Sequence, residues 1–287
     1  MKCNICPRYC SVDRTSSTGF CKEKSMRISH VMLHHWEEPL ISGDENSTGS
    51  GTIFFSGCNL KCVYCQNYEI SSMGNGILTT PEKLVEIIKD LENQGAHNIN
   101  FVTPTHFSNE IITALKLYKP SIPVVWNTSG YESIETLEKL KGLVDIFLTD
   151  IKYYSNELSK KYSSCPNYFE VATNAVVKMR EIVGEDKIID GLMKKGIIIR
   201  HMVLPSCSRD SIKILDWINS KLGNSTIISI MNQYTPCHKA KDFPEISTKL
   251  KPIEYSRVVS HAVSLGFSHA FIQDKDSAST DFIPKFK

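Results

Sequence analysis

The sequence predicts an α/β fold, a partial or full parallel (β/α) barrel preceded by a cysteine-rich, metal-binding segment. From residue 52 onward, apolar and β-branched runs alternate with helical patterns, about seven times in ~240 residues. Strands that alternate with helices pair in parallel, and this number of units favours one barrel over separate domains. Seven of the ten cysteines lie in the first quarter of the chain. A doubly wound open sheet is the alternative architecture.

Length and composition limit the class of protein. The 287 residues are 41% hydrophobic and 22% charged, which excludes a disordered or fibrous chain. A net charge of only +2 gives no global field that would attract nucleic acid or an anionic membrane. No run approaches the roughly 18 apolar residues that span a bilayer, and cysteines stand where a signal peptide would have its apolar core. We therefore expect a cytoplasmic protein, in which clustered cysteines indicate metal binding rather than disulfides.

A loop-like stretch divides the chain. Residues 41–51, ISGDENSTGSG, are rich in Gly, Ser and acidic side chains, which is typical of a surface loop or linker. This stretch predicts a boundary between a cysteine-rich metal or iron–sulfur segment, residues 1–40, and a barrel domain, residues 52–287.

The first segment contains four cysteines within nineteen residues, which we call the amino-terminal cysteine group: Cys3, Cys6, Cys10 and Cys21. So short a segment cannot bury a core of its own, and metal binding would supply the missing folding energy. The alternatives are a second iron–sulfur cluster, which we favour, and a structural zinc. The absence of a His-x3-His helix and of a basic stripe argues against zinc-finger binding of DNA.

The expected elements follow from hydrophobic periodicity, with a period near two for strands and near 3.6 for helices. Strands are expected over 52–56, 99–103, 124–127, 144–149, 196–204, 226–231 and 269–272. Helices are expected over 81–94, 108–118, 133–141, 156–183, 186–195, 209–222 and 252–265. Cap-like residues support two of the helix starts, Thr80 before Pro81 and Ser108 before Glu110.

Directly after the first expected strand lies a segment that we call the cysteine loop, residues 57–67, with Cys58, Cys62 and Cys65 in a C-x3-C-x2-C spacing. With ten cysteines in the chain, this spacing arises by chance about 0.01 times. A structural zinc usually takes four protein ligands, and the loop offers three. Three thiolates on a cubane cluster instead leave one iron open for a substrate or cofactor.

The cysteine loop, with Tyr64 before its last cysteine, resembles the signature of the radical S-adenosylmethionine (SAM) superfamily. The resemblance implies a barrel of the radical SAM type, in which Cys58, Cys62 and Cys65 hold a [4Fe-4S] cluster that binds SAM at its open iron. It also implies reductive cleavage of SAM to methionine and a 5'-deoxyadenosyl radical, which abstracts hydrogen from a substrate. The electron would come from a one-electron donor such as flavodoxin or ferredoxin.

More narrowly, the chain resembles uncharacterised iron–sulfur proteins related to pyruvate formate-lyase activating enzyme, through the stretches WEEPLISG, GTIFFSGCNLKCVYCQNYEIS, VTPTHF and DFIPKF. This likeness leaves two substrate classes open, a glycyl-radical enzyme or a separate molecule that is modified directly. We favour the second, because the cysteine-rich segment would cover the barrel mouth and the charge balance disfavours nucleic acid. The alternative outside enzymes is an iron–sulfur electron-transfer or interaction module.

Polar residues follow two of the expected strands, at the barrel end where chemistry collects. Thr103 and Thr105 stand where many radical SAM enzymes have a Gly-Gly-Glu-like stretch, and their like parity predicts that both accept hydrogen bonds from the SAM ammonium group. Asn127 and Ser129 share the next strand's parity and are candidates for the ribose hydroxyls. Ordinary turn and cap chemistry is the alternative for both pairs.

Charged residues mark two further strand ends. Asp150 and Lys152 resemble the Asp-x-Lys of activating enzymes, and an ion pair there would orient SAM or substrate unless it is exposed. Arg200 interrupts an apolar strand and needs a partner, which the resemblance gives as the SAM carboxylate. We expect His201 to face the other way and be structural, and Gln233 to contact adenine.

The remaining thiols and imidazoles receive simpler interpretations. Single histidines, including the pair His34 and His35, are expected to be surface or core residues. Buried, inert thiols are favoured over radical partners for the scattered cysteines Cys165, Cys207 and Cys237.

Overall fold

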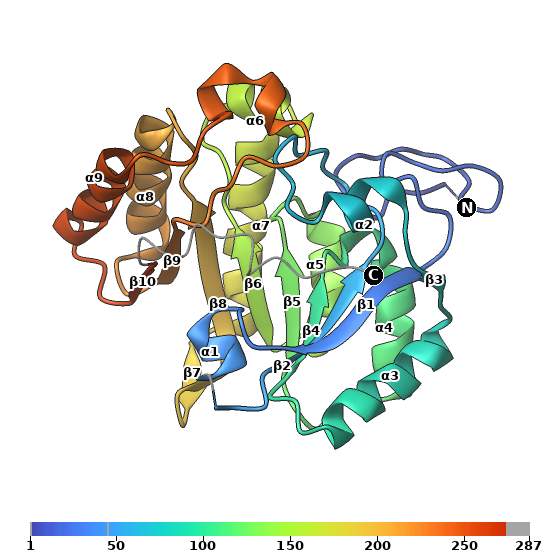
Figure 1. Cartoon of the computed structure of the whole chain (residues 1–287). Coiled ribbons are helices and arrows are strands. Elements are labelled where there is room, and N and C mark those ends of the chain that lie inside the picture. The colour runs from blue at the N-terminus through green and yellow to red at the C-terminus, as the bar shows by residue number, and fades with distance from the viewer. Residues whose placement is uncertain (1, 45, 274–287) are drawn as a thin grey trace.

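A computed structural model describes residues 2–44 and 46–273, and it has one curved sheet at its centre (Figure 1). The strands are β1 (Arg27–His34), β2 (Ser50–Phe55), β3 (Ile77–Leu78), β4 (Ile99–Val102), β5 (Val124–Thr128), β6 (Ile146–Asp150), β7 (Lys187–Ile189), β8 (Leu192–Met202), β9 (Ile227–Met231) and β10 (Ala270–Ile272). The α-helices are α1 (Pro39–Ser42), α2 (Tyr68–Met73), α3 (Pro81–Asn93), α4 (Ser108–Leu117), α5 (Ile134–Leu140), α6 (Asn156–Ser163), α7 (Tyr168–Val183), α8 (Ser208–Leu222) and α9 (Pro252–Ser264). Short 3-10 helices cover Thr105–Phe107, Ala240–Asp242 and Pro244–Ile246.

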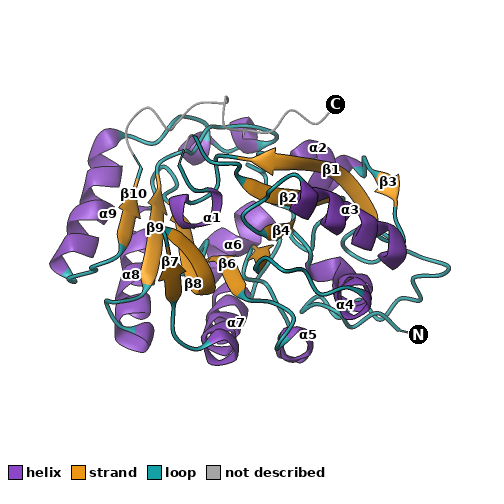
Figure 2. Ribbon diagram, turned by 90° about the horizontal axis from the view of Figure 1, so that it is seen from below, coloured by secondary structure: helices purple, strands orange, loops and turns teal. Residues whose placement is uncertain are grey.

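The sheet is a partial barrel, as the sequence predicts. Its strand order is β10-β9-β8-β6-β5-β4-β2-β1-β3, and all pairs from β2 to β10 are parallel. Within the described residues, the end strands β10 and β3 do not pair with each other, so the barrel stays open. Figure 2 shows the resulting arc, with α3, α4, α5, α7, α8 and α9 along its outer side.

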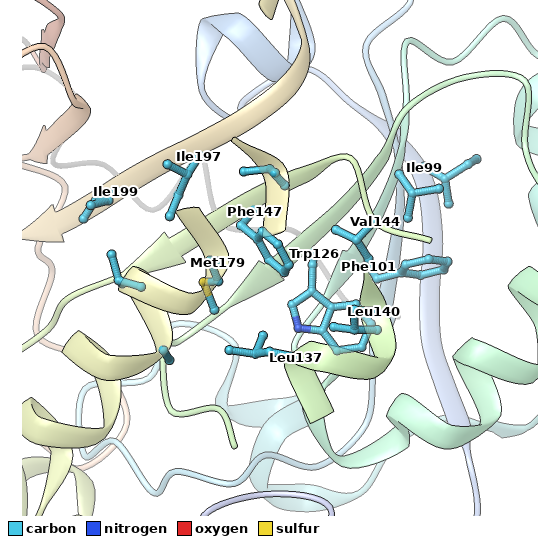
Figure 3. Close-up of a cluster of buried hydrophobic side chains, with 14 of the residues drawn as sticks. Ile99, Phe101, Trp126, Leu137, Leu140, Val144, Phe147, Met179, Ile197 and Ile199 are labelled. Atoms are coloured by element: carbon cyan, nitrogen blue, oxygen red, sulfur yellow. The ribbon is translucent and has the colours of Figure 1, made fainter. Parts of the chain in front are cut away.

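Both faces of the sheet are buried. On the outer face, alternate strand residues pack against the helices, and Figure 3 shows part of this core, including Phe101, Trp126 and Phe147. On the inner face, Val125, Ile146 and Ile198 pack around Ile41 of α1. Because side chains alternate along a strand, the inner face continues from these apolar residues to polar ones near the strand ends.

The structure differs from the expectations in three places. The predicted helix over 186–195 is wrong, because this segment contains β7 and the start of β8, joined by a tight turn at Asp190 and Gly191 with φ of 51° and 75°. The helix predicted over 156–183 is two helices, since Ser164 is left-handed with φ of 53° and Pro166 follows it. The strand β1, within the predicted segment 1–40, joins the sheet antiparallel to β2.

Two further expectations concern membrane-spanning helices and the DFIPKF stretch. No helix among the residues that the structure places is long and apolar enough to cross a membrane. The DFIPKF stretch, residues 281–286, lies outside the described residues.

Candidate active site

One cavity of about 680 Å³ opens at the carboxyl ends of the parallel strands. It is lined by all three cysteines of the cysteine loop, by residues from the strand ends, and by the segment that joins β1 to α1. Of the residues proposed from the sequence, the following line it: Cys58, Cys62, Cys65, Tyr64, Thr103, Asn127, Ser129, Asp150, Lys152, Arg200 and Gln233. The barrel edge therefore brings together proposed residues from Cys58 to Gln233, which lie far apart in the chain.

The three thiols of the cysteine loop are partly buried. Burial raises the pKa of Cys58 to about 12 and that of Cys65 to about 11, so in the unliganded site these groups are thiols. A thiolate form requires a positive counter-charge, which bound iron provides. The amide of Leu60 donates to Cys58 Sγ at 3.3 Å, and the Ser163 hydroxyl donates to Cys62 Sγ at 3.0 Å.

A buried chain of hydroxyl groups connects the cysteine loop to α6. The Tyr64 and Tyr153 hydroxyl oxygens lie 2.5 Å apart, and the Tyr153 and Ser163 oxygens lie 2.7 Å apart. Ser163 continues the chain to Cys62. Tyr64 thus fixes the loop through this network, and its ring packs edge-on against Tyr234 at 5.9 Å.

The amino-terminal segment packs against the outer side of the cysteine loop. The Arg8 guanidinium donates to the carbonyls of Asn59 and Ser164, each at 2.7 Å, and stacks 3.7 Å from the Phe20 ring. Gly57, with φ of 78°, allows a close approach, since a Cβ there would lie 2.8 Å from the carbonyl oxygen of Cys21. The two cysteine-rich parts of the chain are therefore neighbours in space.

The amino-terminal cysteine group gathers within this segment. Burial raises the pKa of Cys6 to about 12, and the charges of Cys10 and Cys21 act in the same direction. The charge of Cys3 likewise adds to the raised pKa of Cys21, whose main cause is burial. In residues 2–44 and 46–273, no group of three or more His, Cys, Asp or Glu side chains is arranged to hold a single metal ion.

Arg200 is at the centre of a charged network on the inner face of the sheet. Its Nε donates to Asp150 Oδ1 at 3.0 Å, its Nη1 to Glu37 Oε2 at 3.2 Å, and its Nη2 to Asn127 Oδ1 at 2.7 Å. Lys152 Nζ lies 2.5 Å from Asp150 Oδ2. Burial alone would raise the pKa of Asp150, but Lys152 and Arg200 outweigh it, so this pKa lies below its usual range.

Two carboxylates in or beside this network were not found by sequence reasoning. Glu37 and Glu38 enter the cavity from the turn after β1, and Glu37 Oε1 also accepts from Asn127 at 3.1 Å. Burial raises the pKa of Glu38 to about 7, against the opposing charge of Arg200. Two adjacent acidic residues in the WEEPLISG stretch, directly before Pro39, were the available signal.

Thr105 does not line the cavity, contrary to the expected parity with Thr103. Thr103 has φ of 57° and Thr105 begins a 3-10 helix, so the alternation of an extended strand ends between them. Thr105 Oγ1 donates instead to Glu132 Oε1 at 2.6 Å, beneath the site. The turn that was weighed as the alternative is therefore the conformation of this stretch.

The residues given structural interpretations lie as follows. His201 points to the outer face, where its ring contacts the Ile151 carbonyl at 2.7 Å and the Ser211 hydroxyl at 2.8 Å. His34 lines the cavity as a buried side chain. None of the scattered cysteines lines the cavity: Cys165 and Cys207 are buried, and Cys237 donates to the Tyr64 carbonyl at 3.2 Å.

The donor set of the cavity fits a three-thiol cluster with one open iron. Three thiols from one loop face it, whereas Cys165, Cys207 and Cys237 do not line it, and Cys237 donates to the Tyr64 carbonyl. Each thiolate of a [4Fe-4S] cluster binds a different iron, which is a looser arrangement than a single ion requires. The cavity volume also lies in the range of small-molecule sites, roughly 300–1,000 Å³.

Comparison with known proteins supports the same assignment. Residues 52–205 match the model of the radical SAM superfamily. The uncharacterized protein MJ0674 of Methanocaldococcus jannaschii is 34% identical over 91% of this chain and 74% of its own length, and the uncharacterized protein MJ0808 of the same organism is 22% identical over 95% and 80%.

A solved structure shares the fold. The maturase HydG of the [FeFe]-hydrogenase superposes with a TM-score of 0.51 at 15% identity, over 77% of this chain. This chain spans only 50% of HydG and 46% of Streptococcus suis SuiB, a peptide-bound structure with a TM-score of 0.49, 11% identity and coverage of 76% of this chain. Superfamily membership implies a [4Fe-4S] cluster and SAM as cofactors. With the match over residues 52–205, the open barrel and the three-cysteine loop, this chain belongs to the radical SAM superfamily.

Proposed function

We propose that this protein reductively cleaves SAM at a [4Fe-4S] cluster held by the cysteine loop, and that hydrogen is then taken from a substrate in the same cavity. The observation that carries the proposal is the convergence of three thiols and the strand-end polar residues on one cavity. When bound and reduced by an external donor, the cluster and SAM would supply the radical chemistry. The protein itself binds and orients SAM and excludes water from the cavity.

The charged network orients SAM in this proposal. Arg200 presents donors toward the cavity and binds the SAM carboxylate, because a guanidinium can offer two parallel N–H groups. Asp150 holds the guanidinium in place by accepting from Arg200, and Lys152 in turn holds the Asp150 carboxylate. Fewer side-chain rotations are then lost when SAM binds.

The other strand ends contact the rest of SAM. Thr103 accepts from the ammonium group, Asn127 and Ser129 contact the ribose hydroxyls, and Gln233 contacts the adenine. The positions of these residues support the assignments, because all four line the cavity that the cysteine loop enters. Thr105 has no part in this set.

The substrate that we favour is a separate small molecule, modified directly. The apolar plug of α1 closes the inner end of the cavity, and the amino-terminal segment covers the cysteine loop, which leaves little room for a folded partner. Activation of a glycyl-radical enzyme is the second candidate, favoured by the resemblance of Asp150 and Lys152 to the Asp-x-Lys of activating enzymes. Deuterium transferred to 5'-deoxyadenosine from a backbone glycine of a co-purifying protein would support that second candidate.

Electron supply completes the proposal. A flavodoxin or ferredoxin would deliver one electron, and the amino-terminal cysteine group would hold a second cluster or a zinc ion beside the cysteine loop. The proximity of Cys21 to Gly57 supports the neighbouring position of the two sites.

The test uses anaerobically reconstituted protein. We expect about four irons per chain at the cysteine loop, a change of the cluster's electron paramagnetic resonance spectrum on SAM addition, and 5'-deoxyadenosine after reduction. Replacement of Cys58, Cys62 and Cys65 by alanine should abolish all three signals, whereas Cys237→Ala serves as the matched control. A fully loaded cluster that ignores SAM and yields no 5'-deoxyadenosine would favour the electron-transfer module instead.

A further inference from the structure

The inner end of the cavity carries a group of polar side chains that we call the carboxylate floor: Glu37, Glu38, Arg200 and Ser229. Arg200 and Ser229 are register partners on the parallel strands β8 and β9, so their side chains point to the same face. The two glutamates approach from the turn that leads into α1. Below the floor, Ile41 and the apolar inner face exclude water.

Negative charge exceeds positive charge around this floor. The carboxylates of Glu37, Glu38 and Asp150 face the two cations Arg200 and Lys152. Asp150 pairs with both cations and Glu37 pairs with Arg200, whereas Glu38 has no ion pair within the described part of the chain. A buried, unpaired carboxylate is costly, which is why burial holds the pKa of Glu38 near neutrality, at about 7.

The hydroxyl of the neighbouring Ser229 also has unused hydrogen-bonding capacity. Ser229 is only 1% exposed and lines the cavity. Its hydroxyl lies close enough to the Glu38 carboxylate to favour the charged form of that group, yet it makes no hydrogen bond of ordinary length and angle in the part of the chain that the structure describes. Buried polar groups almost always have a partner, so such a group indicates an atom that the free protein lacks. A donor placed between Ser229 Oγ and the Glu38 carboxylate would satisfy both groups.

We propose that Glu38 and Ser229 bind a protonated amine of a small substrate on the carboxylate floor. An ammonium group offers three hydrogen-bond donors and one positive charge, which match a hydroxyl acceptor and the uncompensated carboxylate. Met202, Met231 and Phe54 line the same cavity and would contact an apolar chain attached to the amine. This assignment rests on the proposed function, because it names the substrate class for that site.

The test measures binding rather than turnover. Reconstituted, SAM-loaded protein is titrated with n-propylammonium and with n-propanol, which have the same carbon chain but differ in charge, and ligand-observed NMR gives the dissociation constants. We expect the wild type to bind the amine in preference to the alcohol. Glu38→Gln should weaken amine binding by at least about tenfold, and Ser229→Ala by about fivefold. Glu86→Gln, which removes an exposed carboxylate on α3, is the matched control and should change nothing.

Amine affinity should also rise with pH through about 7 in the wild type and stay flat in Glu38→Gln, because Glu38 must lose a proton to pair with a cation. The other charged groups facing Glu38 are Glu37, Asp150 and Arg200, and Arg200 forms ion pairs with both of the other two. Unchanged propanol binding and iron content show that each variant folds.

Two results would overturn the assignment. One is a wild type that does not bind propylammonium or a Glu38→Gln variant that binds it equally well. The other is a Glu38→Gln variant whose SAM affinity falls as far as its amine affinity, since the floor would then belong to SAM. A wild type that binds the amine but never forms 5'-deoxyadenosine would defeat only the proposed function.

Discussion

Replacing Asp150 with asparagine tests whether the charged network holds the barrel edge together. The amide keeps the shape of the side chain but removes the negative charge that faces Arg200 at 3.0 Å and Lys152 at 2.5 Å. The three side chains are only 11%, 15% and 20% exposed, so two cations would lose a poorly hydrated counter-charge. Breaking a buried pair costs about 3–5 kcal/mol, and because Arg200 keeps Glu37 and Asn127 we expect about 3 kcal/mol.

The assay is thermal unfolding of the cluster-loaded protein, with variants compared side by side. At about 2–4 °C per kcal/mol, Asp150→Asn should lower Tm by about 6–12 °C. Glu86→Gln is the control, because its pair with Lys83 is 66% and 63% exposed and should contribute under about 1 kcal/mol. A Tm shift for Asp150→Asn no larger than that of the control would refute the reasoning.

The same variant has a defined pH dependence. The pKa of Asp150 is lowered in the folded state, so its stabilising effect is complete above the unfolded value of about 3.9 and is lost as pH falls through the lower, folded value. The stability gap between wild type and Asp150→Asn should therefore stay constant from about pH 5 to 8 and narrow only below about pH 4. A gap that closes near neutrality would assign the effect to another group.

Two further predictions concern the binding groups. Arg200→Ala should weaken SAM binding at least about tenfold more than His201→Ala, because Arg200 faces the cavity whereas His201 contacts Ile151 and Ser211 on the outer face; equal SAM affinities by equilibrium dialysis would contradict this. Replacing the whole amino-terminal cysteine group with serine should remove about four irons or one zinc per chain while SAM still perturbs the remaining cluster, and unchanged metal analysis would show that this group holds no metal.

The parallel architecture explains why so much of the site was predictable from sequence. The carboxyl ends of parallel strands meet at one edge, so polar residues that interrupt or follow apolar runs converge there. Asn127, Asp150 and Arg200 were identified in this way, and in the structure Arg200 donates hydrogen bonds to both of the others. The cysteine loop could be identified from the spacing of its three cysteines alone, because that spacing is a property of the sequence and does not depend on the tertiary structure.

Local backbone conformation explains the errors. Residues two positions apart share a face only where the chain is extended. Because Thr103 has a positive φ, the chain is no longer extended between Thr103 and Thr105. The Asp190-Gly191 pair is a strong hairpin signal, and the polar residues around it imitated a helical period. The carboxylate floor was missed for a different reason, since nothing local reveals that a segment before the first parallel strand returns to pack beneath Arg200.

The segment before the first parallel strand shows that the site needs more of the chain than the part that matches the superfamily model. The superfamily match begins at residue 52, yet Glu37 supplies the acceptor for Arg200 Nη1, and Ile41 fills the inner face below it. On the other side of the cavity, Arg8 holds the carbonyl of Asn59 within the cysteine loop. A chain that began at residue 52 would leave a buried guanidinium donor unpaired and the barrel interior unfilled, and each defect is destabilising. Residues 2–44 therefore support the site at two places and are part of its structure, whichever metal the amino-terminal cysteine group binds.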